Sequence, residues 1–270
     1  MLHLEDSVSE TLLIPLYMKH LASQMPNPVI HDEAATRLVR QLDYDFSKYD
    51  HIIHTVVGTA IRADYFDRLT ADFIQRHPTP VVVNVGCGLD SRRERIGAAA
   101  DSVPFYDIDL PDVIALRQKL PAQQGETLLA TSAFDAGWMD ELNRLHPNAQ
   151  FLLVIEGVLM YFDRYTVRAL FCDLARRFHR SEVAFDVLNS WMVKNSDRHE
   201  ALKHVRARFV FGCDDDLEFE RWADNLHLMS VKRLTVDFPT WKRSGFLLSL
   251  IGRQIPAFRD STRMLHYRLD

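Results

Sequence analysis

The stretch that decides the fold is Pro80-Val-Val-Val-Asn-Val-Gly-Cys-Gly-Leu-Asp90. Its four valines form a short apolar run, which is typical of a fully buried β-strand. The run ends at Gly86 and Gly88, and glycine adopts backbone angles that other residues avoid and lets a ligand approach the main chain. A helix beginning just after this turn would point its free N–H groups at the same place. The stretch therefore predicts a strand–turn–helix unit that binds a nucleotide-like cofactor at the carboxyl edge of a parallel sheet.

Strands and helices alternate after this unit. Apolar runs predict further strands over residues 103–110, 127–131, 150–156, 182–188, 227–236 and 262–269. Helical patterns lie between them, over residues 111–119, 138–145, 166–178 and 240–254. This alternation predicts a doubly wound α/β fold with a mainly parallel, seven-stranded sheet and right-handed crossovers. We expect the last two strands to form an antiparallel pair.

The α/β pattern is flanked by a helical region and interrupted by an insertion. Residues 7–77 are helical in pattern, with amphipathic helices over 32–43 and 54–75. We therefore expect a single domain over residues 1–270. It consists of a helical N-terminal cap (1–78), a doubly wound core (79–188 and 226–270) and a polar, helical lid insertion (189–225).

Composition and charge narrow the classes of function. The 270 residues are 47% hydrophobic and 26% charged, which suits one globular domain with a substantial core. A formal charge of −5 gives no reason to expect nucleic acid as a partner. The three cysteines are widely spaced and predict neither disulfides nor a metal site, as is typical of cytoplasmic proteins. No apolar segment approaches the ~20 residues of a membrane span, and the first residues lack the pattern of a signal peptide.

Acidic residues stand at the ends of two predicted strands. Asp107 and Asp109 lie two apart on one strand, so their side chains share a face. Asp109 is placed where a nucleotide-binding sheet needs a carboxylate for a ribose diol, although it could also cap the next helix. Glu156 ends a very apolar strand and is followed by Gly157. A carboxylate there is costly unless it is paired or faces a cleft, so it predicts contact with a cationic group of a ligand.

Other polar residues allow both a functional and a structural interpretation. Arg62 stands among apolar neighbours in its helix and could bind a ligand carboxylate, or it could lie on the surface. Ser132, Ala133 and Phe134 follow the third strand, where a ring and small residues could sandwich a base. Two histidine pairs, at 51 and 54 and at 199 and 204, have no third ligand in sequence, so we expect no metal site.

In combination these residues resemble a group of class I methyltransferases with a Rossmann-like fold, the leucine carboxyl methyltransferases and the polyketide-synthesis O-methyltransferases of the tetracenomycin type. The stretches that carry the resemblance are Arg62-Ala-Asp-Tyr-Phe-Asp67, Val83-Asn-Val-Gly-Cys-Gly-Leu-Asp-Ser-Arg92, Tyr106-Asp-Ile-Asp-Leu-Pro-Asp-Val113 and Glu156-Gly-Val-Leu-Met-Tyr-Phe162. Ser132-Ala-Phe-Asp-Ala-Gly-Trp-Met-Asp140 and Phe211-Gly-Cys-Asp-Asp215 resemble the polyketide branch. The resemblance covers about residues 55–236.

The resemblance implies S-adenosylmethionine as cofactor and S-adenosylhomocysteine as product. Arg62 would then grip the cofactor carboxylate and Glu156 would face its amino group. Gly86 would let the methionine part pass, with Cys87, Gly88 and Gly157 beside it. Asp109, together with Asp107, would hold the ribose, and Ser132, Ala133 and Phe134 would flank the adenine. The leucine carboxyl branch has an acidic residue where this chain has Ser132, and its N-terminal lysine has no evident counterpart here.

The implied reaction is methyl transfer to a carboxyl or hydroxyl oxygen of a small molecule. A carboxylate, with an ordinary pKa of ~4, is ionised at neutral pH, whereas a phenol, with a pKa of ~10, would gain from a general base. No base stands out, and Tyr161 is the residue we expect near the acceptor. Two alternatives remain open, a nucleotide-dependent oxidoreductase and a methyltransferase-like protein that binds without turnover. Ser91, at the third glycine position of the dinucleotide-binding motif, counts against the oxidoreductase.

Overall fold

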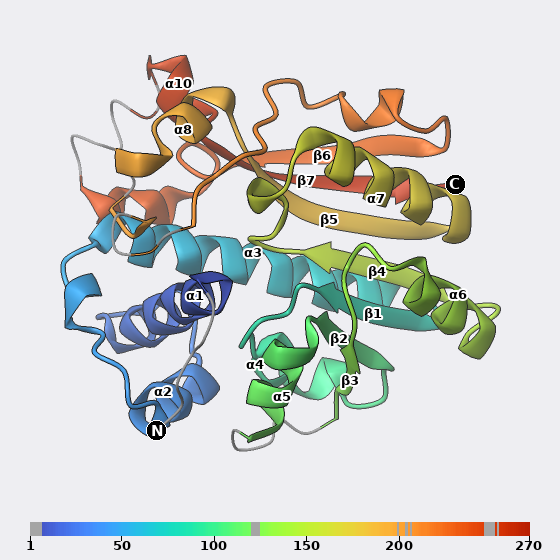
Figure 1. Cartoon of the computed structure of the whole chain (residues 1–270), viewed down its shortest axis with the longest axis horizontal. Helices are drawn as coiled ribbons and strands as arrows, with labels where there is room; N and C mark the ends of the chain where they lie inside the picture. The colour runs from blue at the N-terminus through green and yellow to red at the C-terminus, as the bar shows by residue number, and fades with distance from the viewer. Residues whose placement is uncertain are drawn as a thin grey trace.

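A central sheet organises the chain (Figure 1). The computed structural model describes residues 7–119, 125–198, 200–202, 205, 207–245, 252 and 254–270. Seven strands in this part of the chain form one sheet in the order β3-β2-β1-β4-β5-β7-β6. Their bounds are β1 Pro80–Val85, β2 Phe105–Asp109, β3 Thr127–Ala130, β4 Gln150–Ile155, β5 Ser181–Leu188, β6 Leu226–Arg233 and β7 Thr262–Leu269. The doubly wound, mainly parallel sheet predicted from the sequence is thus confirmed.

The first five strands are parallel, and β7 runs antiparallel to both of its neighbours, β5 and β6. The order reverses direction between β1 and β4, because β2 and β3 lie on one side of β1 and the later strands lie on the other. In open α/β sheets, this switch point leaves a crevice outside the carboxyl ends of the two strands. The Gly86 turn follows β1 and Glu156 follows β4, so the fold brings both predicted stretches to that crevice.

Helices cover both faces of the sheet. Figure 1 shows α6 and α7 on one face and the long α3 on the other. The α-helical bounds are α1 Ser7–Gln24, α2 Glu33–Gln41, α3 Ile53–Arg76, α4 Arg92–Ile96, α5 Pro111–Lys119, α6 Ala136–Leu145, α7 Arg164–Arg177, α8 Ser190–Lys194 and α10 Pro256–Arg259. Short 3-10 helices are η1 Ser47–Tyr49, η2 Gly97–Ala100, η3 Leu159–Tyr161, η4 Ser196–Arg198, η6 Phe219–Arg221 and η7 Pro239–Ser244.

Side chains of the buried strands point alternately to the two faces of the sheet, so the core has a part on each face. Val83 of β1 and Leu153 of β4 pack with Leu170 of α7, whereas Leu152 packs with Phe66 of α3 on the opposite side. Because successive side chains of a strand point to opposite faces, a strand buried on both sides must be apolar throughout, as these are. The helices α1 and α2 pack against each other, and α1 packs against α3, so the N-terminal helices extend the core beyond the sheet.

Two predicted helices differ from the structure. The insertion over 189–225 is predicted to be helical, but in its last part the chain forms only the 3-10 turn η6 before it enters β6. Phe219 of this turn is buried against Phe171, Phe185 and Trp222, and such a compact aromatic cluster needs a tight turn rather than a longer helix. The helix predicted over 240–254 begins as η7 and stops at Gly245, whose φ is +133°. Residues 246–251 and 253 of that prediction lie outside the described residues.

The amino edge of β5 carries a buried carboxylate, Glu182. Arg76, at the end of α3, donates two hydrogen bonds of 3.0 Å to its two oxygens, and the ring Nε2 of His266 lies 2.7 Å from Oε2. Burial opposes ionisation of Glu182, but hydrogen bonds with His266 and Arg76 outweigh it and lower its pKa from 4.5 to about 2. This cluster ties α3 and β7 to the strand between them.

Glu182→Gln is expected to lower the melting temperature by about 5 °C at pH 6.5, because Arg76 loses a buried charged partner. The native pKa lies below the unfolded one, so this stabilisation is complete above pH 4.5 and disappears as the pH falls towards 2. The difference between wild type and variant should therefore shrink to less than half at pH 3. Circular dichroism melts at both pH values measure it. Exposed Glu141, paired only with Arg144, supplies the control Glu141→Gln, and an equal loss there would contradict the assignment.

No helix in the described ranges is both long enough and apolar enough to span a bilayer.

Candidate functional site

A cavity of about 660 Å³ lies at the carboxyl ends of β1 and β4. Its floor is the turn after β1, from Gly86 to Asp90, together with Glu156 and Gly157 after β4. The helices α1 and α3 form one wall, and Tyr161 of η3 contributes from the edge of the sheet. Described residues of the 188–202 and 234–262 segments close the remaining sides, including Trp191, Leu202, Leu234 and Trp241. Segments from nearly the whole length of the chain therefore meet around one space.

The turn after β1 has a geometry that only glycine fits. Gly86 has a φ of +72°, and its N–H and that of Cys87 donate to the carbonyl of Ile108 at 2.8 and 3.0 Å. A Cβ on Gly86 would lie 2.4 Å from Cγ2 of Val158, which is a severe overlap. The N–H of Gly88 donates to Oδ2 of Asp109 at 2.7 Å. The turn thus presents bare main chain to the cavity and is fixed from behind by β2.

Gly86→Ala is expected to cost at least about 3 kcal/mol of unfolding free energy, because backbone strain adds to the overlap with Val158. Gly97 is the control: its φ is +66° and its ψ is −139°, but nothing lies within 4 Å of a Cβ placed there, so Gly97→Ala should cost only backbone strain, about 1–3 kcal/mol, and less than Gly86→Ala. Urea unfolding measures both. Adding Val158→Ala to Gly86→Ala should recover part of the loss. Equal losses of unfolding free energy in the two alanine variants would show that overlap with Val158 adds nothing to the cost.

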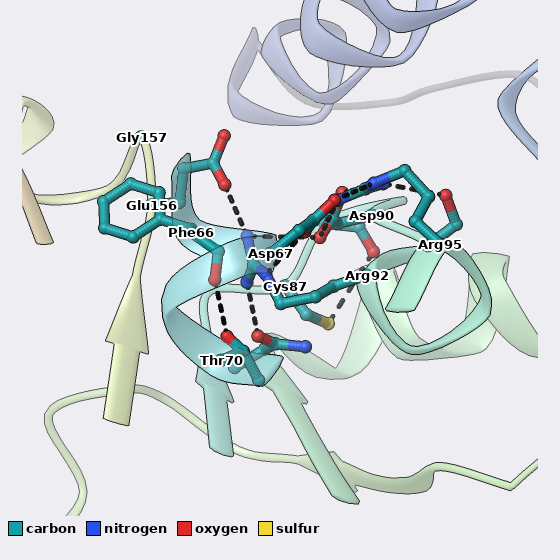
Figure 2. Close-up of polar contacts among 12 residues, drawn as sticks. Phe66, Asp67, Thr70, Cys87, Asp90, Arg92, Arg95, Glu156 and Gly157 are labelled. Atoms are coloured by element: carbon teal, nitrogen blue, oxygen red, sulfur yellow. Dashed lines mark hydrogen bonds and ion pairs between the residues drawn. The ribbon is translucent and has the colours of Figure 1, made fainter. Parts of the chain in front are cut away.

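A buried ionic cluster lies beneath the cavity (Figure 2). Arg62 of α3 donates from Nε to Glu156 at 3.0 Å and from Nη1 to Asp186 of β5 at 2.9 Å. Arg92 of α4 donates to the other oxygen of Glu156 and lies 3.2 Å from Asp67. Figure 2 shows Arg92 between Glu156 on one side and Asp67 and Asp90 on the other. The predicted carboxylate and the predicted arginine therefore contact each other within the chain.

Burial and neighbouring charges determine the ionisation state of the carboxyl groups in this cluster. Burial opposes the charged form of Glu156, but Arg62 and Arg92 outweigh it and hold the pKa below its ordinary value. Asp186 is buried as deeply, and for it burial prevails, so its pKa is raised despite Arg62. Glu156 is therefore an anion at neutral pH, held between two guanidinium groups at the cavity floor.

Sequence reasoning missed Lys19 of α1, which lines the cavity and pairs with Asp90 of the Gly86 turn. Its side chain is only 4% exposed. Burial opposes the charged form of Asp90, yet Arg95, Lys19 and Arg92 hold its pKa well below the ordinary value. One signal was available in the sequence: Lys19 is the single Lys, Arg, Asp or Glu between Glu10 and Asp32.

The structure brings most predicted site residues together. Those lining the cavity are Arg62, Gly86, Cys87, Gly88, Glu156, Gly157 and Tyr161. Burial raises the pKa of Tyr161 to about 12, so its hydroxyl keeps its proton at neutral pH. Such a hydroxyl can donate a hydrogen bond, but it is a poor general base.

The remaining predicted residues lie outside the described lining. Asp109 is half-buried, and its oxygens accept from the N–H groups of Gly88 and Leu110. Asp107 lies two residues deeper in β2 and is only 1% exposed. Its carboxylate is bound by Asn84 and Arg117, so it does not face the cavity and instead supports the turn. The two aspartates have different surroundings, because Asp107 lies deeper in the strand than Asp109.

Ser132, Ala133 and Phe134 follow β3 at the same edge of the sheet. The ring of Phe134 packs edge-on against Phe162, 4.5 Å between centroids, which places this stretch beside the segment that carries Tyr161. The indole N–H of Trp138 donates a hydrogen bond to the carbonyl of Ala133, which fixes the loop. All three predicted residues are partly exposed and so remain accessible at the sheet edge.

Among the described residues, no group of three His, Cys, Asp or Glu side chains has a geometry suitable for a metal ion. His54 instead lines the cavity. His199 and His204 lie outside the described residues.

Known proteins resemble this chain in sequence and in fold. The family model described as leucine carboxyl methyltransferase matches residues 13–175. The tetracenomycin polyketide synthesis O-methyltransferase TcmP of Streptomyces glaucescens is 30% identical over 264 residues, covering 96% of both chains. The S-adenosyl-L-methionine-dependent methyltransferase dpfgK of Gibberella zeae is 27% identical, covering 94% of this chain and 92% of its own. A solved DUF574-family protein from Streptomyces avermitilis has the same fold, with a TM-score of 0.61 at 14% identity, covering 98% of this chain and all of its own.

Proposed function

The chain belongs to the leucine carboxyl methyltransferase family, and we propose that it transfers a methyl group to a carboxyl or hydroxyl oxygen of a small molecule held in the cavity. It is an S-adenosylmethionine-dependent O-methyltransferase, as its family and its relatives along almost the whole chain establish. Neither alternative from the sequence, an oxidoreductase or a binding protein without turnover, is favoured by these relatives. What remains to be proposed is the role of each residue and the nature of the acceptor.

One observation supports the roles that we propose for these residues: positively and negatively charged side chains lie together beside the glycine turn. The amino-acid end of the cofactor carries a carboxylate and an ammonium group, which require opposite partners. Lys19 and Arg62 offer the cations, and Glu156 and Asp90 offer the anions, all on the cavity wall. Gly86, Gly88 and Gly157 line the same cavity, so main chain without side chains is available there for a ligand to lie against.

The nucleoside end would lie along the sheet edge towards β2 and β3. Asp109 retains lone pairs beyond its two backbone hydrogen bonds, so it can accept from the ribose hydroxyls. Ser132, Ala133 and Phe134 are the partly exposed residues next to it along that edge. We assign the adenine to them. Asp107 is left out of the cofactor site, because Asn84 and Arg117 occupy its oxygens.

The chemical step needs little from the protein beyond alignment. When bound, the cofactor would supply an already activated methyl carbon on its sulfonium; the acceptor oxygen would form the O–C bond with a lone pair as the S–C bond breaks, and a hydroxyl acceptor would lose its proton to water. Effective alignment brings the two reacting atoms to about 3–3.5 Å. Tyr161, protonated at neutral pH, is placed to donate a hydrogen bond that orients the acceptor. A carboxylate acceptor requires no proton transfer, which agrees with the poor basicity of this phenol.

Calorimetry with S-adenosylhomocysteine tests the proposal. We expect one molecule to bind per chain, and a lack of binding by folded wild-type protein would contradict it. Titration with NADH and NADPH serves as the control for a dinucleotide site, and neither is expected to bind. We also place the protein in the cytoplasm, because Cys87 and Cys213 are buried and unpaired, as suits a reducing compartment.

A further inference from the structure

Asp186 of β5 is a buried carboxylate to which the proposed function gives no role. Its side chain is 0% exposed and lies outside the described lining of the cavity. Parallel pairing with β5 runs to the end of β4, so Asp186 lies level with Glu156, the residue that follows that strand. Its Oδ2 accepts a hydrogen bond from Nη1 of Arg62 at 2.9 Å, and its Oδ1 accepts from the N–H of Gly157 at 2.6 Å. One carboxylate therefore contacts both the arginine of α3 and the main chain next to Glu156.

The same strand carries a second carboxylate, Glu182, at its opposite end. Glu182 lies four residues before Asp186 on the same face of β5 and also meets an arginine of α3, Arg76. Both terminal nitrogens of Arg76 donate to the two oxygens of Glu182, each at 3.0 Å. Neither Glu182 nor Arg76 belongs to the described cavity lining. This pair shows how an arginine of α3 meets β5 at a place remote from the cavity: one carboxylate takes both terminal nitrogens.

Arg62 distributes its three nitrogens differently. Nε donates to Glu156 at 3.0 Å and Nη1 donates to Asp186, while Nη2 makes no hydrogen bond to a described residue. A Cβ placed on Gly157 would lie 3.2 Å from Nη2, so this nitrogen lies beside the glycine where a side chain is missing. Arg62 and Gly157 both line the cavity, and the Arg62 side chain keeps 16% of its surface exposed. Two carboxylates thus hold the guanidinium so that its third nitrogen is left for a ligand.

The chemistry of these contacts requires a carboxylate at position 186. Both groups that Asp186 contacts are donors, and a carboxylate only accepts, so it satisfies the two at once. An amide offers one acceptor oxygen and one donor group, so an asparagine here could keep the contact with Arg62 or with Gly157 but not both. A buried carboxylate is costly unless it is paired. A neutral acceptor would be enough to hold the N–H of Gly157, and the charge is therefore needed for Arg62.

We propose that Asp186 is a positioning residue for the cofactor: it fixes the guanidinium of Arg62 relative to Glu156, and so sets the spacing between the cation and the anion that bind the amino-acid end. Asp186 acts through Arg62 and needs no contact with the cofactor. The inference rests on the proposed function, in which Arg62 binds the cofactor carboxylate and Glu156 its ammonium group.

The sign of the effect separates positioning from charge. Removal of a negative charge beside Arg62 would by itself strengthen the attraction of Arg62 for a ligand carboxylate. Loss of the orientation of Arg62 weakens the same contact, because a guanidinium binds a carboxylate through a fixed fork of donors. A variant without the Asp186 charge therefore binds the amino-acid end more weakly only if positioning is the larger effect.

A matched pair of ligands tests the inference. 5′-Methylthioadenosine shares the nucleoside and the thioether of S-adenosylhomocysteine but lacks the amino-acid end, so the ratio of the two affinities measures what that end contributes. We expect Asp186→Asn to lower this ratio about tenfold, with 5′-methylthioadenosine binding within about twofold of wild type, as measured by calorimetry. Asp186→Ser removes the carboxylate without adding an amide donor and should lower the ratio to a similar extent. In an Arg62→Ala background, Asp186→Asn should change the ratio less than about threefold, because the amide can still accept from Gly157.

Glu182→Gln is the matched control. It also removes a buried carboxylate of β5 from an arginine of α3, so it should lower the melting temperature and leave the ratio unchanged. An equal fall of the ratio in this control, equal weakening of both ligands in Asp186→Asn, or unchanged or tighter binding of S-adenosylhomocysteine there would overturn the inference. Failure of both Asp186 variants to fold would also overturn it, because Asp186 would then be a residue that the fold itself requires.

Failure of the proposed function would give a different result, since wild type would then not bind S-adenosylhomocysteine at all. If wild type binds S-adenosylhomocysteine and 5′-methylthioadenosine equally well, the amino-acid end gains nothing at Arg62. The positioning role of Asp186 is then wrong, while the binding of the methyltransferase product still stands.

Discussion

Arg62→Ala is expected to weaken S-adenosylhomocysteine binding more than a hundredfold and to lower the melting temperature by about 10 °C. Both effects have one cause: the guanidinium is the common partner of Glu156 and Asp186 at the cavity floor. Removing one member of a buried ionic cluster leaves uncompensated charge and costs about 3–5 kcal/mol, and each kcal/mol lowers the melting temperature by about 2–4 °C in a chain of this size. The affinity falls further because the proposed carboxylate partner is lost.

Two variants separate these causes. Arg68 lies on the same helix but is 78% exposed and paired only with Asp64, so Arg68→Ala should change neither quantity measurably. Arg62→Lys keeps the charge without the planar fork and should recover part of the stability and less of the affinity. Calorimetry and thermal melts measure each variant. If Arg62→Ala lowers stability but binds the product within threefold of wild type, Arg62 is a structural residue only.

The stability lost in Arg62→Ala should also depend on pH. In wild type the pKa of Glu156 lies below its unfolded value of 4.5, so its ionised form stabilises the fold above that pH and ceases to do so as the pH falls. The variant should therefore lie furthest below wild type at neutral pH, and the gap should narrow in acid.

Asp109→Ala is expected to weaken S-adenosylhomocysteine binding about a hundredfold, because in the proposed binding mode the two ribose hydroxyls lose a charged acceptor. Asp109 also accepts from Gly88 and Leu110, so some loss of stability is expected as well. Asp135, the N-cap of α6, is a matched aspartate at the same sheet edge that accepts from the N–H of Gly137. Asp135→Ala should lose about 1 kcal/mol of stability and no affinity. Similar affinities for the two alanine variants would show that Asp109 only fixes the turn.

The parts of the structure that could be predicted well are those that depend on local sequence alone. The apolar run closed by Gly86 predicts β1 and its turn, because buried strands and positive backbone angles leave few alternatives. The last strand was predicted at its observed bounds, since β7 lies inside the sheet and is buried over most of its length. In each case the periodicity of one segment is enough, without knowledge of its partners.

The surroundings of other residues depend on tertiary contacts, so their roles could not be predicted from the sequence. Lys19 acquires its position through Asp90, which is 71 residues away, and no local pattern records that pairing. Glu156 was predicted to meet a cation of the ligand, but two arginines of the chain itself already contact it. His54 and Trp241 line the same cavity although they lie far apart in the sequence, so nothing in either neighbourhood indicates that they share it.

The walls around the cavity include Lys19 from the first helix and Trp241 from the last part of the chain. During translation, the N-terminal helices leave the ribosome long before their partners have been made. Even when the parallel strands are complete, the space is still open on the side that Trp241 covers. A nascent chain therefore has no complete binding pocket until the segment that carries Trp241 has been made, and the cofactor can stabilise only a chain that includes this segment.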